Sequence, residues 1–273
     1  MVVNKKQVVL LLAVLLSFAT EGRSQDDDAV LINDVDIGLI NDVDVGLIND
    51  VVTKSLSDDL PAAKITGSEH GWRELTAVDF EKVNCDPETW QWTDGVLHCT
   101  GNPVGILRSK ESYKNFEMVV EWRHLEDAGN SGIFAWIPEE SIAGLKRGQL
   151  PQGIEFQVLD LGYTKAYEES SGKKADWFTC HGDVFPTAGS TMKPFPPIAP
   201  DGQRSFPSKN LSKKFGEWNH YYIRCINGEA RLWVNGEEVS GGTDCKPSSG
   251  YMALESEGAP IDFRNMRIRV LPD

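Results

Sequence analysis

Short runs in which apolar and polar residues alternate recur from about residue 70 to the end of the chain. Alternation is typical of a half-buried β-strand, because successive side chains of a strand point to opposite faces of the sheet. Asp94-Gly95 and Asn235-Gly236 lie between such runs and favour tight turns, since glycine tolerates positive φ. No long stretch has a convincing helical period. The pattern therefore predicts an all-β sandwich of many short strands.

The segment GIEFQVLD, residues 153–160, shows this alternation clearly. Its apolar residues would enter a core, which leaves Glu155 and Gln157 together on the other face and Asp160 at the end of the strand. This polar face is either the floor of a catalytic site or an ordinary solvated surface. Alternation alone favours the solvated surface, because half-buried strands are normally polar on one side.

The run NFEMVVEWRHL, which begins at residue 115, predicts another strand with alternate apolar residues buried. Arg123 then lies on the outer face of that strand. We expect Arg123 either to stabilise an oxyanion in a site or to form a surface ion pair with Glu121 or Glu155.

The run GYMALESEG, which begins at residue 250, would place Glu255 and Glu257 on the face opposite its apolar residues. Glu255 could pair with Glu155 or ligate a cation, and two close carboxylates would push one pKa upward, which suits a general acid or base near neutral pH. No cofactor motif is evident. A hard divalent ion could be held by Glu155, Glu255 and Asp160, although no spacing rule identifies such a site.

Residues 161–215 are poor in strand patterns and rich in proline, glycine and lysine. A loop of this length is usually functional or disordered, and its many aromatic residues favour a packed loop that covers one face. His181 lies in this loop near Asp183, whose carboxylate would raise the pKa of His181 and orient its ring. We expect His181 to be either a catalytic imidazole or a surface residue.

The N-terminus has a cationic pair, Lys5 and Lys6, before an apolar run that is too short for a confident membrane span. This layout predicts a signal peptide over residues 1–24, and hence an exported protein (periplasmic, extracellular or cell-surface) with no stable membrane insertion after cleavage. An uncleaved anchor helix is the alternative.

Residues 25–69 contain the repeats LINDVDIG and LINDVDVG and are strongly acidic. We expect a disordered acidic spacer here. The repeats share alternating aspartates with calcium loops, but each lacks a third acidic ligand, a correctly placed glycine and a closing glutamate. The globular domain would then span residues 70–273.

The chain has 273 residues and a formal charge of −14 without a basic patch, which argues against nucleic acid as a partner. Its five cysteines leave at least one thiol unpaired in a monomer. Cys225 and Cys245 lie in neighbouring predicted strands and are the preferred disulfide, followed by Cys85 with Cys99. The spacings contain no CxxC, which argues against structural zinc.

Five motifs occur in order: GNSGIF from residue 129, then GIEFQVLD, GEWNHYYI, LWVNGEEV and LESEGAPIDFRNMRI. Over residues 70–272 the chain resembles the 3-keto-disaccharide hydrolase domain family. The resemblance implies a concanavalin A-like jelly-roll sandwich whose concave sheet binds sugar. It also implies elimination of the anomeric substituent of a 3-keto-glycoside to give a 3-keto-2-hydroxy-glucal, and hydration of that glucal.

The resemblance suggests roles for three residues. Asn130 matches the GNSG motif and would bond a sugar hydroxyl or cap a turn. Trp136 stands where the family commonly has arginine, and would be a stacking platform for a pyranose or a packing aromatic. Glu255 replaces a glutamine often found there, and so adds a carboxylate.

The implied chemistry needs a base for the proton on sugar carbon 2, a group that stabilises the enolate, and an acid for the leaving group. We therefore expect an exported carbohydrate-active enzyme. The alternatives are a non-catalytic carbohydrate-binding module and an ordinary glycoside hydrolase, which needs two opposed carboxyls. The expected catalytic residues are Glu155, His181 and Glu255, and the expected binding residues are Arg123, Asn130, Trp136, Gln157 and Asp160.

Overall fold

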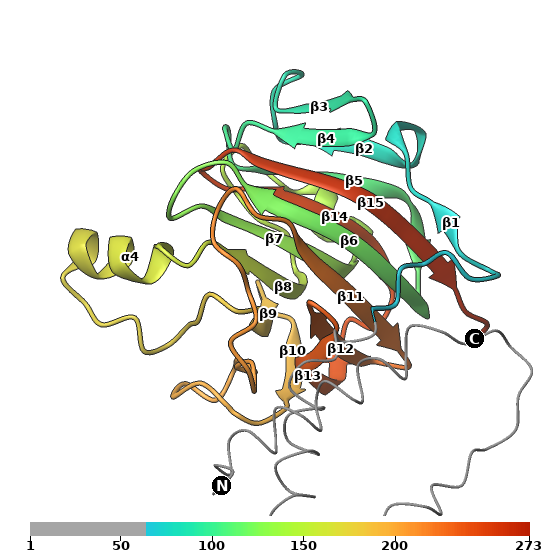
Figure 1. Cartoon of the computed structure of the whole chain (residues 1–273). Coiled ribbons are helices and arrows are strands. Elements are labelled where there is room, and N and C mark those ends of the chain that lie inside the picture. Colours follow the sequence, from blue (N-terminus) through green and yellow to red (C-terminus); the bar gives the residue numbers. More distant parts are fainter. Residues whose placement is uncertain (1–63) are drawn as a thin grey trace, which may run out of the picture. The chain divides into compact units, whose positions relative to one another are not determined.

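The computed structural model describes residues 64–273, which fold into two antiparallel β-sheets packed face to face (Figure 1). This arrangement confirms the predicted all-β sandwich. The predicted signal peptide and most of the acidic spacer, including the repeats considered as calcium loops, lie outside the described residues.

The larger sheet has nine strands. Its order is β10 (Thr191–Pro194), β13 (Glu237–Lys246), β12 (Glu229–Val234), β11 (Asn219–Ile226), β6 (Phe116–His124), β15 (Ile261–Val270), β4 (Val96–Cys99) and β3 (Trp90–Thr93), with β1 (Arg73–Glu74) also paired to β15. Long antiparallel strands dominate its centre, where β6 lies between β11 and β15.

The smaller sheet has six strands and positions the candidate site. Its order is β2 (Phe80–Val83), β5 (Gly105–Tyr113), β14 (Gly250–Ser256), β7 (Asn130–Ile137), β8 (Gly153–Leu159) and β9 (Val184–Thr187). The helical elements are short: η2 (Ala77–Asp79), α3 (Glu139–Ala143) and α4 (Tyr163–Ser171). Within residues 64–273 no helix is long and apolar enough to cross a membrane.

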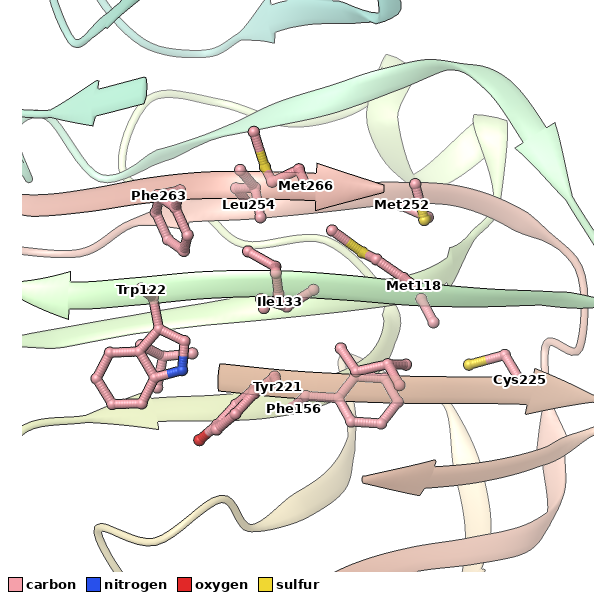
Figure 2. Packing of buried hydrophobic residues seen from close by; sticks show 14 of the residues in the cluster. Met118, Trp122, Ile133, Phe156, Tyr221, Cys225, Met252, Leu254, Phe263 and Met266 are labelled. Carbon is pink, nitrogen blue, oxygen red and sulfur yellow. The ribbon is translucent and has the colours of Figure 1, made fainter. Parts of the chain in front are cut away.

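The core lies between the two sheets and draws on both of them (Figure 2). Met118 and Trp122 of β6 and Phe263 of β15 extend from the larger sheet, while Phe156 of β8 and Leu254 of β14 extend from the smaller one. These are the inward residues that alternation predicts, so the expected parity of β6, β8 and β14 is confirmed.

Trp136 belongs to this core, and its prediction as a stacking platform is wrong. It is fully buried, has a φ of 60°, and donates its indole N–H to the carbonyl of Lys114. The pairing of β7 with β14 shifts near this point, so Ala135 and Trp136 both face the core. Such a bulge adds a residue to one strand and breaks the alternation on which the prediction relied.

The predicted disulfides do not form, because all five cysteines are free thiols. Cys225 lies in β11 and Cys245 in β13, and β12 separates the two strands. Two strand spacings amount to roughly 9.5 Å, which is beyond the reach of a disulfide. The sequence predicted that the strands containing Cys225 and Cys245 are adjacent, but in the sheet they are not.

The long segment after β8 is a packed structure, as its aromatic content predicts. It contains α4, β9 and β10, and Tyr163 and Tyr167 of α4 pack against Phe178 with their ring centroids 5.7 and 5.2 Å away. Alternation could not reveal α4, because the helix buries none of its residues fully and so carries no clear apolar stripe.

Candidate active site

The outer face of the smaller sheet brings two carboxylates together. Glu155 extends from β8 and Glu255 from β14, on either side of β7. Between them lies Gly132, where an added Cβ would be 2.6 Å from Oε2 of Glu255 and 2.7 Å from Oε1 of Glu155. Only a glycine leaves room for this carboxylate pair, and the expected proximity of Glu155 and Glu255 is confirmed.

The carboxylate pair is buried and poorly compensated. Glu255 is 0% exposed, and neither of its carboxylate oxygens accepts a hydrogen bond from a nitrogen or hydroxyl donor, so its polar neighbours are the carboxyl groups of Glu155 and Glu257. Burial raises the pKa of Glu255 well above its ordinary value, and the charge of Glu155 raises it further. Glu255 therefore keeps its proton near neutral pH.

Glu155 differs from Glu255 because a guanidinium lies nearby. Burial raises the pKa of Glu155, and the charge of Glu257 adds to this effect, but the charge of Arg204 acts in the opposite direction. Glu255 has no such cation among the causes of its shift. Glu155 is therefore the member of the pair that ionises more readily.

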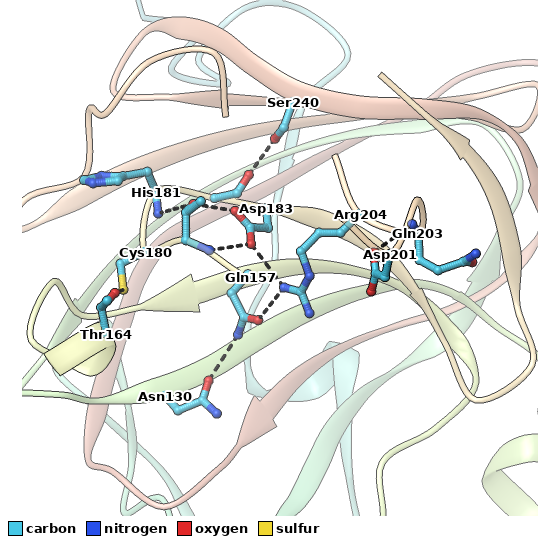
Figure 3. Close-up of polar contacts among 12 residues, drawn as sticks. Asn130, Gln157, Thr164, Cys180, His181, Asp183, Asp201, Gln203, Arg204 and Ser240 are labelled. Carbon is cyan, nitrogen blue, oxygen red and sulfur yellow. Dashed lines mark hydrogen bonds and ion pairs between the residues drawn. The ribbon is translucent and has the colours of Figure 1, made fainter. Parts of the chain in front are cut away.

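Arg204 is the cation of this site and was not among the residues predicted from the sequence. The residue is 6% exposed, and its guanidinium donates to Oε1 of Gln157 at 3.3 Å and to Oδ2 of Asp183 at 3.2 Å (Figure 3). It also stacks on the ring of Phe185, 3.5 Å from the centroid. A signal was available, because Arg204 is the only arginine between residues 161 and 215 and arginine is the preferred cation for buried ion pairs.

Asp183 anchors Arg204. Burial raises the pKa of Asp183 to about 6, although Arg204 and the N–H and hydroxyl of Thr179 lower it by charge and hydrogen bonding. Asp183 is thus mostly ionised at neutral pH and holds the guanidinium against the sheet.

A chain of amides continues from Arg204 along the same face. Gln157 donates through Nε2 to Oδ1 of Asn130 at 3.1 Å and to the carbonyl of Ser131 at 3.2 Å. Asn130 in turn donates through Nδ2 to Oε2 of Glu257. Each amide is held in one orientation by its neighbours, so Gln157 and Asn130 present fixed polar atoms beside the carboxylate pair.

A cleft of about 290 Å³ opens at this end of the sheet. Asn130, Glu257 and Tyr163 are among the polar residues that line it. Burial raises the pKa of the Tyr163 phenol, and the charge of Glu257 adds to the effect, so the phenol remains a proton donor at neutral pH. The remaining lining residues are Val104, Glu126, Ala128, Gly258 and Ala259.

Arg123 does not join this site, and its predicted ion pairs are wrong. It lies in β6 of the larger sheet and donates through Nε and Nη2 to Oδ2 of Asp262 at 3.0 and 2.9 Å. Its guanidinium also lies 4.6 Å from the ring centroid of Trp218. Alternation indicates that Arg123 faces outward, but it does not say from which of the two sheets.

The His181 side chain does not join the hydrogen-bond network of Arg204 and Gln157. Its ring points away from Gln157 and Arg204 (Figure 3), while the Asp183 carboxylate binds Arg204 and Thr179 instead. Burial lowers the pKa of His181, so the expected rise is wrong. His181 and Asp183 are close in sequence, yet their side chains have different surroundings.

Asp160 is a structural tie between loops. Its carboxylate accepts the backbone N–H groups of Ala128, Gly162 and Phe215. Burial would raise the pKa of Asp160, but these hydrogen bonds outweigh it and the pKa is lowered. The carboxylate oxygens are therefore occupied, which contradicts a binding role.

The metal ligand set suggested by the sequence is not assembled. Across the described residues, no group of three or more His, Cys, Asp or Glu side chains is arranged to hold a metal ion. Asp160 in particular points its oxygens at backbone donors rather than at Glu155 and Glu255.

Comparison with known proteins agrees with this architecture. Residues 66–269 match the family model described as the 3-keto-alpha-glucoside-1,2-lyase-like domain. A 3-keto-disaccharide hydrolase of Bacteroides thetaiotaomicron is 22% identical over 248 residues, which cover 74% of this chain and 75% of the relative.

Two crystal structures of glycosyl hydrolase candidates from Parabacteroides distasonis share the fold. One is 21% identical with a TM-score of 0.51 and covers 73% of this chain and 99% of its own. The other is 19% identical with a TM-score of 0.55 and covers 78% of this chain and 99% of its own.

Proposed function

Because the chain belongs to the 3-keto-alpha-glucoside-1,2-lyase-like domain family, we propose that it is an exported enzyme that cleaves or hydrates 3-keto-glycosides. The relative named 3-keto-disaccharide hydrolase supports the substrate class. Export is supported by the N-terminal sequence alone. The observation that carries the proposal is the fully buried Glu255, which faces Glu155 across Gly132 and has no donor group to compensate its charge.

The reaction begins at the proton on sugar carbon 2, which the neighbouring ketone makes acidic. Glu155 removes this proton, because Arg204 makes it the more readily ionised member of the carboxylate pair. The electron pair of the C2–H bond forms an enolate whose charge lies on the ketone oxygen. The Tyr163 phenol and the Asn130 amide, which line the cleft, donate hydrogen bonds to that oxygen.

Elimination then breaks the bond between carbon 1 and its oxygen substituent. Glu255, which keeps its proton near neutral pH, gives that proton to the departing oxygen. The product is a 3-keto-2-hydroxy-glucal. Hydration runs in reverse: Glu255 takes a proton from water as the hydroxide adds to carbon 1, and Glu155 returns its proton to carbon 2.

The test incubates the purified protein with 3-keto-disaccharides of both anomeric configurations and follows release of the free sugar. We expect release from the 3-keto substrates and none from the unoxidised disaccharides. Glu155→Gln should lower turnover at least ~100-fold, which is the usual contribution of a general base. Glu121→Gln is the matched control, because Glu121 lies on the larger sheet and pairs with Arg264.

The alternatives give different results in the same experiment. Absence of turnover on every 3-keto donor by folded protein contradicts the proposal, and saturable binding of unmodified glycan would then indicate a binding module. Hydrolysis of unoxidised glucans that depends on both Glu155 and Glu255 would indicate an ordinary glycoside hydrolase.

A further inference from the structure

Trp177 is a partly exposed aromatic residue held rigidly beside the candidate site. It lies between α4 and β9, and 40% of its surface is exposed. Its indole N–H donates to the Tyr167 hydroxyl at 3.3 Å, and its ring centroid lies 4.8 Å from that of Phe178. A large apolar ring fixed in this way presents a preformed surface to a ligand.

Two sets of contacts connect this ring to the site. On one side, the guanidinium of Arg204 lies 5.2 Å from the Trp177 ring centroid while it donates to Gln157. On the other side, Phe178 packs edge-to-face against Tyr163, which lines the cleft. Trp177 does not line the cleft, and the buried Phe178 ring contacts both Trp177 and Tyr163 of the cleft wall.

We propose that Trp177 is the stacking platform for the second sugar ring of the substrate, the ring that leaves when the anomeric bond breaks. The inference rests on the proposed function, since it takes the reacting 3-keto ring to occupy the cleft. The C–H face of a pyranose is apolar and fits an exposed indole, whereas its hydroxyls remain in water. The enzyme would therefore prefer disaccharides to glycosides with small leaving groups.

The experiment compares two substrates that share the reacting ring: a 3-keto-disaccharide and methyl 3-keto-glucoside. Trp177→Ala should raise KM for the disaccharide about tenfold, equivalent to 1.4 kcal/mol, and leave the methyl glycoside unchanged. Trp177→Phe should retain most of the affinity. Trp218→Ala is the control, because Trp218 is partly exposed and stacks with Arg123 of the larger sheet. An equal effect of Trp177→Ala on both substrates would show a merely structural role and overturn the inference.

A binding measurement separates this inference from the proposed reaction. Calorimetric titration of the wild-type protein with an unoxidised disaccharide and with its monosaccharide requires no turnover. We expect tighter binding of the disaccharide, and loss of that preference in Trp177→Ala. Equal affinity of the wild-type protein for the two sugars overturns the inference, whatever the outcome of the turnover assay.

Discussion

Replacing Gly132 with alanine tests whether Glu155 and Glu255 act as a pair. The φ of Gly132 lies outside the left-handed region, so the backbone accepts alanine without strain. The new Cβ would stand 2.6 Å from Glu255 and 2.7 Å from Glu155. Ordinary carbon–oxygen contacts begin near 3.4 Å, so each carboxylate oxygen must move by roughly 0.7 Å.

This displacement should affect catalysis much more than stability. A misplacement near 1 Å can cost about 100-fold in rate, so we expect kcat/KM for a 3-keto-disaccharide to fall roughly 100-fold. Alanine also restricts the unfolded chain, which offsets part of the crowding in the folded state. The melting temperature should therefore stay within about 5 °C of the wild-type value, equivalent to roughly 1 to 2 kcal/mol for a domain of this size.

Gly144→Ala is the matched control for Gly132→Ala. Gly144 has a φ of −94°, and the nearest atom to its added Cβ is the Glu140 carbonyl oxygen at 3.9 Å. The activity of the Gly144→Ala variant should equal that of the wild type. Two results would refute the reasoning: Gly132→Ala with more than about a third of wild-type activity, or Gly132→Ala that fails to fold, since only the carboxylates should have to move.

Three further predictions concern charge and sulfur. Glu255→Gln should lower turnover at least ~100-fold and raise the melting temperature, and this rise should grow from pH 5 to pH 8. The folded-state pKa of Glu255 is raised, so wild-type stability is lost as pH increases; a pH-independent difference would contradict this. Arg204→Gln should lower stability by about 3 kcal/mol in denaturant melts, because it leaves buried Asp183 without its cation; an unchanged midpoint would show that the pair is dispensable. Adding reductant should not change the melting temperature, because Cys225 and Cys245 are free thiols; a fall would reveal a disulfide.

Alternation along single strands correctly predicted which polar side chains share the outer face of the smaller sheet. Glu155 and Gln157 share a face because side chains of a strand alternate with a period of two, and the same rule places Glu255 outward. These relationships are local, so they do not depend on how strands are ordered in space. The expected pairing of Glu155 with Glu255 then required only that β8 and β14 flank the same strand.

The predictions were wrong where they depended on how segments distant in sequence are arranged in space. Arg123 faces outward as predicted, but β6 lies in the larger sheet, so Arg123 is far from the chemistry around Glu155. The Cys225–Cys245 prediction failed for the same reason, because β12 lies between the two strands. The prediction for Trp136 was wrong because of a β-bulge, and a bulge cannot be recognised from an alternating pattern.

Arg204 and Trp177 could not be placed from sequence because both lie in the long segment after β8. The path of such a segment is set by its contacts, here the stacking of Arg204 on Phe185 and the packing of Trp177 on Phe178. Aromatic content predicted that the segment packs, but not which residue would meet Gln157.

The burial of Glu255 also distinguishes the enzyme from the binding module on the same fold. A binding surface for neutral sugar needs hydrogen-bonding groups and stacking rings, which Asn130, Tyr163 and Trp177 supply without Glu255. Burying an ionisable group with no partner costs stability, and the glutamine that the variant Glu255→Gln introduces would avoid that cost. Proton transfer does need such a group, because burial holds a carboxyl protonated near neutral pH. The buried Glu255 therefore lowers stability without benefit in a sugar-binding protein, whereas an enzyme that catalyses elimination needs its proton.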